Sequence, residues 1–353
     1  MDLLKIHPDF QWNGKSVANF TQLIDRLDNS SNIHRNFLQA WSNDTSYIIA
    51  HTSGSTGKPK SIKIPKQNLL HSARKTIDFF DLRPGTTALL NLSPDFIAGK
   101  LMWIRALTGG WHLDVIASDN KSIERQLSAK TYDFSAMVPL QVYYNLSNIH
   151  RIKQLIIGGG VVSEELQKKL YHLPNRIYAT YGMTETLTHI AVKPLNKVAE
   201  NQFYTDKIFS GAYHLLDGIG IELDSRGCLV IHAPEITAEP VVTNDLVKIL
   251  DDKHFIWLGR IDNIINSGAL KFIPEQIEEK LSAYIDVPFF IAGQPDEQLG
   301  EKLVLIVESK PFELPDFSKL LDRYEIPKQV FFIDRFVRTD SGKIKRAETL
   351  RKL

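Results

Sequence analysis

Hydroxyl, glycine and lysine residues are concentrated in one short segment, Thr52-Ser-Gly-Ser-Thr-Gly-Lys-Pro-Lys60, which follows the apolar run Tyr47–His51. Glycines allow tight turns and close approach of the backbone, and hydroxyl and ammonium groups can bind phosphate oxygens. The segment is not a Walker A loop, because its two glycines are too close together and Pro59 follows Lys58. The pattern therefore indicates a phosphate-binding loop, with a flexible polar hairpin as the alternative.

Two later segments also follow apolar runs and carry groups that could bind a ligand. In Tyr181-Gly-Met-Thr-Glu-Thr186, the tyrosine could stack on a base, and Glu185 could hold Mg²⁺, which prefers carboxylate and phosphate oxygens. The alternative is a strand-to-helix turn capped by Thr184. Gly158-Gly-Gly160 leaves backbone groups open to a ligand ring or phosphate, and an ordinary turn is the alternative there.

The last two segments lie in the C-terminal part of the chain. Gly259-Arg-Ile-Asp-Asn-Ile-Ile-Asn-Ser-Gly268 combines charged residues with turn residues. In Arg338-Thr-Asp-Ser-Gly-Lys-Ile-Lys-Arg346, a lysine after Ser-Gly on a tight turn could be presented to an anion, although a basic tail is usually solvated surface.

Apolar runs between these segments predict the elements that hold them in place. Short apolar runs predict buried strands at Tyr47–His51, Thr87–Leu92, Leu113–Ala117, Phe134–Val138, Gln154–Ile157 and Arg176–Ala179. Helical spacing predicts helices over Gln67–Phe80 and Ser163–Leu173, the second with a serine cap and an acidic first turn. Alternation of strands and helices indicates an α/β fold with mostly parallel sheets.

The pattern changes after about residue 205, where turn signals separate short strands. A β-rich subdomain is expected from the runs Ile219–Leu223, Cys228–His232, Leu246–Leu250 and His254–Leu258. The remaining elements predict a small α+β domain: strand Asn263–Ile265, helix Pro274–Tyr284, strands Phe289–Ala292 and Leu303–Val307, a helix near Asp316–Tyr324 and strand Gln329–Ile333. We therefore predict a large N-terminal domain over residues 1–260 and a small, mobile C-terminal domain over residues 261–353.

Composition narrows the class of protein further. The chain has 353 residues, of which 43% are hydrophobic and 24% charged, as in ordinary globular proteins. With 42 basic and 41 acidic residues the net charge is +1, so no basic excess favours a nucleic-acid partner. Cys228 is the single cysteine, which excludes an internal disulfide and a multi-cysteine zinc site. No signal peptide or membrane span is predicted, and the expected location is the cytoplasm.

Together and in this order, the segments resemble the acyl-adenylate-forming superfamily of acyl-CoA synthetases, adenylation domains and luciferases. Six segments carry the resemblance: the phosphate loop Thr52–Lys60, the adenine-loop region Gly158–Gly160, the aromatic-Gly-x-Thr-Glu motif Tyr181–Thr186, Thr243-Asn-Asp245 in place of Thr-Gly-Asp, the hinge motif Gly259–Gly268 and the lysine motif Ser341-Gly-Lys343. The resemblance extends from about residue 46 to residue 350.

The resemblance implies an AMP-forming acid–thiol ligase that acts in two steps. A carboxylate attacks the α-phosphorus of ATP and gives acyl-AMP and pyrophosphate, and a thiol, usually that of coenzyme A, then attacks the acyl carbonyl. Both reactants of the first step are anions, so catalysis must supply positive charge and positioning. The implied partners are a small carboxylic acid, ATP with Mg²⁺, and coenzyme A, while the oligomeric state stays open and a homo-oligomer is compatible with the sequence.

The roles of individual residues follow from the same resemblance. The implied phosphate ligands are Thr52, Ser53, Ser55, Thr56 and Lys58. The other implied ATP contacts are Thr184 at the α-phosphate, Glu185 at Mg²⁺, Tyr181 with Gly158, Gly159 and Gly160 around adenine, and Asp245 and Arg260 at the ribose. Lys343 would stabilise charge at the developing carboxylate–phosphorus bond, Asp262 would be the hinge, and Gly268 would lie on the loop at the coenzyme A side.

The segment from Ser93 to Leu107 matches the family's acid-pocket helix and places two cations, Lys100 and Arg105, in an apolar run. A buried cation needs an anionic partner, and Arg105 could grip a second carboxylate of the substrate. The alternatives are a surface lysine and an arginine paired with a protein carboxylate such as Asp95. The segment is also similar to the pocket helix of o-succinylbenzoate–CoA ligases of menaquinone biosynthesis, which makes o-succinylbenzoate the expected acid. His189 could line the same pocket.

The chain departs from the family in two respects. Only 51 residues precede Thr52, where members usually carry well over 100, so an N-terminal subdomain is expected to be largely missing. Asn244 replaces the usual glycine beside Asp245. Three alternatives to the o-succinylbenzoate ligase stay open: another aryl- or short-chain acyl-CoA ligase, a stand-alone adenylation domain, and a degenerate nucleotide-binding scaffold.

Overall fold

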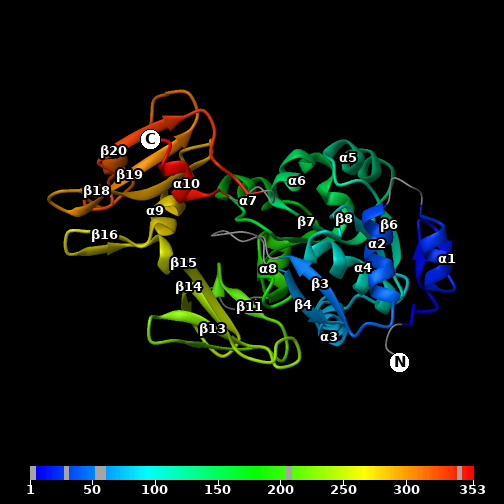
Figure 1. Cartoon of the computed structure of the whole chain (residues 1–353). Helices are drawn as coiled ribbons and strands as arrows, with labels where there is room; N and C mark the ends of the chain where they lie inside the picture. Colours follow the sequence, from blue (N-terminus) through cyan, green and yellow to red (C-terminus); the bar gives the residue numbers. More distant parts are fainter. Residues whose placement is uncertain (1–4, 28–31, 52–60, 204–208, 340–343) are drawn as a thin grey trace. The chain divides into compact units, whose positions relative to one another are not determined.

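The computed structural model describes residues 5–27, 32–51, 61–203, 209–339 and 344–353 (Figure 1). It divides the chain into two compact units. The first contains Met1–Val162, Lys169–Gly220 and His232–Val241, and the second contains Ser163–Lys168, Ile221–Ile231 and Val242–Leu353. The boundary predicted at residue 260 stays a prediction. None of the helices in the described ranges has the length and apolar character needed to cross a membrane.

A mostly parallel sheet forms the centre of the first unit, as the apolar runs predicted. Parallel pairing joins β9, β8, β7, β5, β6 and β1 in this order, and antiparallel strands are added at the ends, β10 and then β11 beside β9 and β2 beside β1. The strand bounds are β1 (Gln11–Trp12), β2 (Lys15–Ser16), β5 (Thr87–Leu90), β6 (His112–Val115), β7 (Tyr132–Met137), β8 (Ile152–Ile157), β9 (Arg176–Gly182), β10 (His189–Pro194) and β11 (Tyr213–Leu215). The predicted α/β fold class is confirmed.

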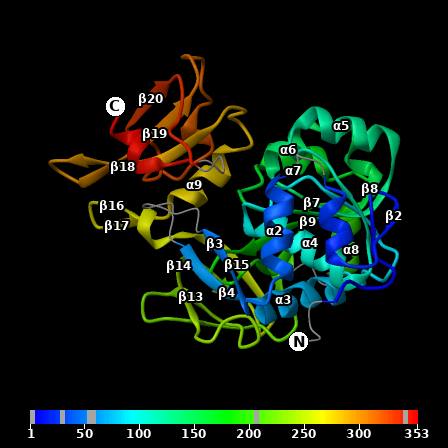
Figure 2. The same ribbon diagram turned by 45° about the vertical axis from the view of Figure 1, so that its right-hand side comes forward.

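Helices lie on both sides of this sheet. Figure 1 and Figure 2 show α5 and α6 above β7 and β8, with α3 and α4 below them. The bounds are α1 (Phe20–Asp25), α2 (Asn32–Ser42), α3 (Lys66–Phe79), α4 (Ile97–Gly109), α5 (Asn120–Ala129), α6 (Pro139–Tyr144), the 3₁₀ helix η3 (Leu146–Arg151), α7 (Glu164–Leu170) and α8 (Lys197–Phe203). A separate antiparallel pair, β3 (Tyr47–His51) with β4 (Ser61–Pro65), corrects the expectation that Tyr47–His51 joins the parallel sheet.

Helix α4 is buried from Gly99 to Leu107, because this stretch is apolar apart from Lys100 and Arg105. It packs against α3, and its Trp103 donates from Nε1 to His34 Nδ1 of α2 at 2.9 Å. Gly99 allows close packing at its start, since a Cβ there would lie 2.2 Å from Ser93 O. Gly110 ends the helix in the left-handed conformation at φ 69°. The expected acid-pocket helix is therefore held rigidly in the interior of the first unit.

The second unit begins with the expected β-rich part. Strands β12 (Gly220–Leu223), β13 (Cys228–His232), β14 (Val241–Ile249) and β15 (His254–Arg260) are neighbours in this order, and β14 and β15 pair antiparallel. The small sheet that follows contains β16 (Ile265–Ser267), β17 (Leu270–Phe272), β18 (Phe289–Asp296), β19 (Gly300–Glu308) and β20 (Gln329–Ile333), with helices α9 (Pro274–Leu281) and α10 (Arg346–Leu350).

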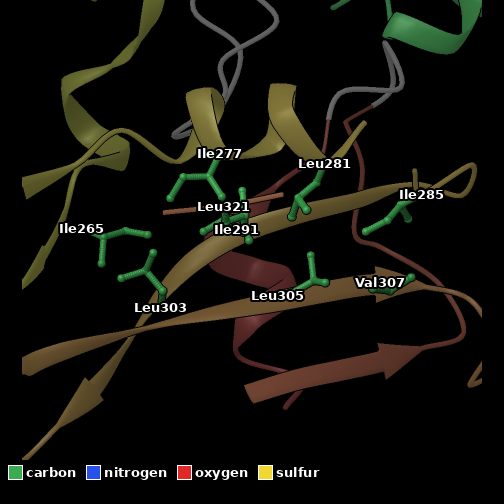
Figure 3. Packing of buried hydrophobic residues seen from close by; sticks show 9 residues of the cluster. All are labelled: Ile265, Ile277, Leu281, Ile285, Ile291, Leu303, Leu305, Val307 and Leu321. Carbon is green, nitrogen blue, oxygen red and sulfur yellow. The ribbon is translucent and has the colours of Figure 1, made fainter. Parts of the chain in front are cut away.

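Successive residues of β18 and β19 point to opposite faces of the small sheet, and both faces are covered. On the α9 side the buried cluster contains Ile265, Ile277, Leu281, Ile285, Ile291, Leu303, Leu305, Val307 and Leu321 (Figure 3). On the other face it contains Phe290, Ala292, Val304, Ile306 and Phe336. Because both faces are buried there, the two strands contain the continuous apolar runs Phe289–Ala292 and Leu303–Val307, which made them predictable from the sequence.

Two predicted elements of this part are wrong. The helix expected near Asp316–Tyr324 is only a 3₁₀ turn, η6 (Phe317–Lys319), whose Asp316 side chain caps Ser318 N, after which the chain turns again. The strand expected at Asn263–Ile265 is replaced by a 3₁₀ turn, η5 (Ile261–Asn263), and β16 begins at Ile265. Polar side chains that bond locally compete with the hydrogen bonds of regular helices and strands, as the Asp316 side chain does at Ser318.

Candidate active site

The predicted acid-side residue Arg105 lies in the middle of α4 and is 2% exposed. Its Nη2 donates to Thr188 Oγ1 at 3.3 Å, and its Nη1 lies 3.9 Å from Met102 Sδ. Among the described residues nothing bonds to Nε, and no carboxylate offsets the burial that lowers the pKa of Arg105 to about 9. The expected alternative, an ion pair with Asp95, is absent from the described part of the chain. Arg105 is thus a desolvated cation without a described anionic partner.

Arg105 begins a chain of polar side chains that also contains His189, another predicted acid-side residue. Thr188 Oγ1 lies 3.3 Å from His189 Nδ1, and Thr76 Oγ1 of α3 lies 3.4 Å from His189 Nε2. Burial lowers the pKa of His189 well below its ordinary value, and the positive charge of Arg105 lowers it further. His189 therefore stays neutral beside a cation. The bridging Thr188 was missed by the sequence analysis, because its partner Arg105 lies 83 positions away.

Lys100 is placed differently from Arg105. Its ammonium group donates to the backbone carbonyls of Pro94 and Asp95, the second at 3.1 Å, just before α4 begins. Burial lowers the pKa of Lys100, and the charge of Asp95 opposes this shift. The described contacts thus hold Lys100 at the start of α4 and do not connect it to the polar side chains of Arg105, Thr188 and His189.

The residues expected around adenine lie at the ends of two neighbouring parallel strands. Gly158, Gly159 and Gly160 follow β8, and Tyr181 lies near the end of β9, with its ring edge-on to Tyr213 at 5.7 Å. A Cβ on Gly158 would lie 2.4 Å from Thr180 Oγ1, and Gly159 has a positive φ of 79°. Glycine is therefore required where the backbone meets the next strand. This edge of a parallel sheet is where ligands commonly bind.

Thr184 and Glu185 lie in the turn between β9 and β10. The fully buried Thr186 builds this turn: its Oγ1 accepts from Met183 N at 3.1 Å and is 2.8 Å from Thr188 O. The turn leads into a strand, so the alternative of a strand-to-helix turn capped by Thr184 is wrong. Thr184 is half-buried, and Glu185 is exposed.

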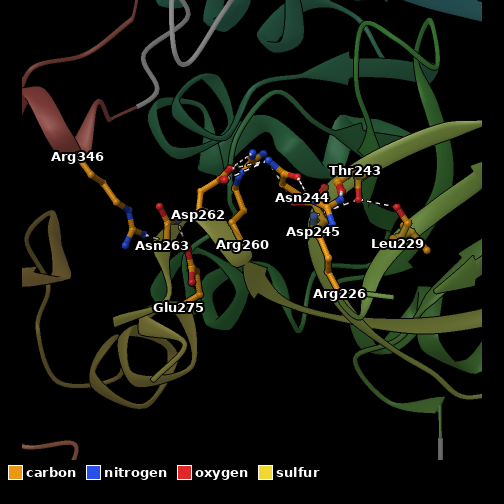
Figure 4. Close-up of polar contacts among 10 residues, drawn as sticks. All are labelled: Arg226, Leu229, Thr243, Asn244, Asp245, Arg260, Asp262, Asn263, Glu275 and Arg346. Atoms are coloured by element: carbon orange, nitrogen blue, oxygen red, sulfur yellow. Dashed lines mark hydrogen bonds and ion pairs between the residues drawn. The ribbon is translucent and has the colours of Figure 1, made fainter. Parts of the chain in front are cut away.

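The residues expected at the ribose and the hinge form one polar cluster in the second unit (Figure 4). Asp245 of β14 lies opposite Arg260 of β15, and Arg260 Nη1 is 3.8 Å from Asp245 Oδ1. Arg260 Nη2 donates to Asp262 Oδ2 at 2.7 Å, and Asn244 Nδ2 lies 3.1 Å from both carboxylate oxygens of Asp262. Asn244, which replaces the family's glycine, therefore supports the expected hinge residue.

The electrostatic state of Asp262 follows from these contacts. Burial acts to raise its pKa, but the hydrogen bonds from Arg260 and Asn244 and the charges of Arg260 and Arg226 outweigh this effect and lower the pKa. Thr243 completes the cluster, because its Oγ1 donates to Leu229 O at 2.8 Å and accepts from Asp245 N at 3.0 Å. Asp262 is thus an ionised carboxylate held by two neighbouring strands.

Several predicted residues have less or no structural description. Gly268 lies in the turn between β16 and β17 with φ 62°, and its N–H donates to Leu299 O at 2.7 Å. The residues expected in the phosphate loop and the lysine expected to be catalytic lie outside the described residues: Thr52, Ser53, Ser55, Thr56, Lys58 and Lys343. Within the described part, no group of three or more His, Cys, Asp or Glu side chains could hold a metal. Glu185 alone therefore suits only an ion that takes its other oxygen ligands from phosphate or water.

The comparisons with known proteins agree with the resemblance inferred from the motifs. Residues 11–237 match the family described as AMP-binding enzyme. An acyl-CoA synthetase (AMP-forming)/AMP-acid ligase II-like protein from Dyadobacter fermentans is 32% identical, with a TM-score of 0.62 over 95% of this chain and 98% of that one. A 2-succinylbenzoate–CoA ligase from Listeria monocytogenes is 25% identical over 88% of this chain and 70% of its own length.

A solved structure with lower identity has the same fold. The o-succinylbenzoate coenzyme A synthetase from Bacillus subtilis, in complex with ATP and magnesium ion, gives a TM-score of 0.73 at 19% identity, over 86% of this chain and 69% of that one. Ligases named for other aryl acids match this chain at 25% identity, so sequence similarity does not single out one acid. The match of the family over most of the chain shows that this protein belongs to the AMP-binding enzymes.

Proposed function

We propose that this AMP-forming acid–CoA ligase converts o-succinylbenzoate into o-succinylbenzoyl-CoA in menaquinone biosynthesis. The observation that carries the proposal is Arg105, a buried guanidinium for which no described carboxylate compensates. Leaving a cation in this state costs free energy, which a bound anion can offset. An acid with one carboxylate uses it at ATP, so the partner of Arg105 would be a second carboxylate of the same substrate.

The surroundings of Arg105 support an acid with an apolar body and a second charge. Trp103, Ile104 and Leu107 of α4 are fully or almost fully buried, which makes this part of the helix an apolar framework around Arg105. A planar guanidinium can bind a carboxylate through two parallel hydrogen bonds. The neutral His189 contacts Thr188, the hydroxyl partner of Arg105, and adds no competing charge.

The first step brings two anions together, so this chain's residues would act mainly by positioning and charge. Tyr181 would stack on adenine, Thr184 would contact the α-phosphate, and Asp245 would accept from the ribose hydroxyls with Arg260 beside it. Lys343 would stabilise charge where the carboxylate oxygen and the phosphorus meet. The phosphate loop would hold the two leaving phosphates through its hydroxyls and Lys58.

Glu185 fits a magnesium ion that arrives with ATP, because it is an exposed carboxylate in the turn between β9 and β10. Such an ion would neutralise phosphate charge when it is bound. In the second step, movement at Asp262 would withdraw Lys343 and bring the turn at Gly268 to the thiol. The thiol then displaces AMP from the acyl carbonyl.

The proposal is tested by measuring pyrophosphate release and thioester formation with purified protein, ATP, Mg²⁺ and coenzyme A. The acids to compare are o-succinylbenzoate, benzoate and a medium-chain fatty acid. We expect the highest kcat/KM with o-succinylbenzoate and formation of its coenzyme A thioester. A higher kcat/KM with benzoate or the fatty acid would contradict the proposed substrate. Acyl-AMP formation without transfer to coenzyme A would favour an adenylation domain, and ATP binding without any exchange would favour a scaffold.

A further inference from the structure

Glu275, in the first turn of α9, contacts residues next to the expected hinge and the C-terminal segment that follows Lys343. Its side chain is 10% exposed. Oε1 accepts from Asn263 Nδ2 and lies 3.8 Å from Arg346 Nη2 (Figure 4). Oε2 is buried and receives no hydrogen bond from any residue that the structure describes. A buried, half-satisfied carboxylate is costly and therefore calls for an explanation.

The backbone before the hinge approaches the same carboxylate. Gly259 has φ 149°, and a Cβ built there would lie 2.6 Å from Glu275 Oε2 and 2.5 Å from Ile273 Cγ2. Only glycine allows α9 to come so close to the end of β15. Glu275 is thus in contact with chain on both sides of Asp262: Gly259 precedes this residue and Asn263 follows it.

Arg346, the third partner, fixes the segment after Lys343. It binds Glu278 through two hydrogen bonds of 2.6 and 2.7 Å, donates to Ile291 O at 3.2 Å, and lies 5.4 Å from the ring centre of Phe290. Paired hydrogen bonds between guanidinium and carboxylate are among the strongest polar contacts in proteins. Arg346 stands three positions after Lys343 in the sequence.

The segment before Lys343 is fixed as well. Arg338 and Ile344 form an antiparallel bridge across the residues between them. Glu308 of β19 binds the Arg338 guanidinium and accepts from Phe336 N at 2.7 Å. The described residues before and after positions 340–343 are therefore attached to the small sheet or to α9. Glu275 contacts both Arg346 and the turn Ile261–Asn263.

We propose that Glu275 is a positioning residue that connects the turn Ile261–Asn263 to Arg346, so that rotation at Asp262 is transmitted to residues 344–346, which directly follow Lys343 in the sequence. The proposal rests on the proposed function, because it assigns Lys343 to adenylation. Without this connection the hinge can still bend, but the lysine no longer follows it faithfully. Loss of Glu275 should therefore impair adenylation more than thioester formation, which does not need the lysine.

The test compares Glu275→Gln with Glu279→Gln, which removes the same charge from an exposed position of α9. Asn263→Ala breaks the same connection from the other side. In Glu275→Gln and Asn263→Ala we expect kcat for pyrophosphate release to fall about 10-fold or more, since small misplacements of catalytic groups are costly. KM for acid and ATP should change little. Transfer from supplied acyl-adenylate to coenzyme A should keep its rate, and Glu279→Gln should resemble wild type.

A second readout needs no substrate and therefore separates this proposal from the proposed function. In hydrogen exchange, amides in 261–264 and 344–346 should exchange faster together in Glu275→Gln, while those of β19 stay protected. The double variant that combines Glu275→Gln with Asn263→Ala should lose no more activity than either single variant, because both substitutions break the same connection. The positioning role would be overturned if segments 261–264 and 344–346 of Glu275→Gln exchanged hydrogen at wild-type rates. Equal losses of rate in adenylation and in thioester formation would overturn it as well. Failure of the wild type to adenylate any acid would overturn only the proposed function if the coupled exchange is observed.

Discussion

Replacing Arg105 by methionine should leave the protein folded but remove its preference for an acid with a second carboxylate. The guanidinium is 2% exposed and makes one hydrogen bond to an uncharged oxygen, Thr188 Oγ1, at 3.3 Å. Replacing buried charged groups by hydrophobic residues of similar volume is often neutral or stabilising by ~1–4 kcal/mol. We therefore expect an unchanged or higher melting temperature for Arg105→Met.

The effect on substrate choice should be large in comparison. A hydrogen bond to a charged group contributes ~1.5–3 kcal/mol. At 1.4 kcal/mol per factor of ten, kcat/KM for o-succinylbenzoate should fall roughly 10- to 150-fold. The value for benzoate, which cannot reach Arg105 with a second carboxylate, should change little. The assay is pyrophosphate release with both acids, beside thermal unfolding.

The matched control is Arg83→Met, because the Arg83 side chain is 78% exposed and paired with Asp81. This variant should keep wild-type kinetics with both acids. Equal losses of kcat/KM for the two acids in Arg105→Met would refute the reasoning, since they would show that Arg105 does not recognise a second carboxylate. A marked fall in melting temperature would also refute it, because the cation would then have a structural partner.

Three further predictions concern the lysine, the hinge and a buried histidine. Lys343→Ala should reduce adenylation by about 10²–10³-fold but spare thiol transfer from supplied acyl-AMP; equal losses in both half-reactions would count against its assignment. Gly259→Ala places a Cβ 2.5 Å from Ile273 Cγ2 at φ 149°, so the free energy of unfolding should fall by about 1–3 kcal/mol in denaturant titrations, and an unchanged midpoint would contradict this. His189 stays neutral when folded because burial lowers its pKa, whereas the unfolded state takes up a proton below about pH 6.5. Wild-type stability should therefore decline between pH 6.5 and 5 by up to ~1.4 kcal/mol per pH unit, and more weakly in His189→Gln; parallel declines would show that His189 is not the cause.

The sequence was informative wherever local pattern and burial agree. Strands β5 to β9 contain short apolar runs because they lie in a sheet covered by helices, and β18 and β19 each contain an apolar run where both faces of their sheet are buried. The helix at Gln67–Phe80 also follows from its apolar spacing, and the structure has α3 at Lys66–Phe79. The motifs were sufficient to identify the family because several of them occur in a fixed order.

Partners far apart in the sequence could not be predicted. Thr188 meets Arg105 and Glu275 meets Arg346 only after folding, and no local pattern marks either pair. The strand predicted at Asn263–Ile265 was started too early, because Asn263 still belongs to the turn Ile261–Asn263, whose polar side chains bond to Arg260 and Glu275, and the strand begins at Ile265. The periodicity of hydrophobic residues indicates which residues are buried, but it does not indicate which polar groups contact each other in the folded protein.

The way in which the small sheet is covered bears on the energy of any reorientation. All members of its two buried clusters lie at Ile265 or later in the sequence, so these hydrophobic contacts are made entirely among residues that follow Asp262. A swivel at Asp262 would therefore expose none of this apolar interior to water, and the work required would come from breaking polar and ionic contacts. Binding and release of charged reactants could therefore rotate a hinge at Asp262, because the free energies of its two orientations would differ by only a small amount.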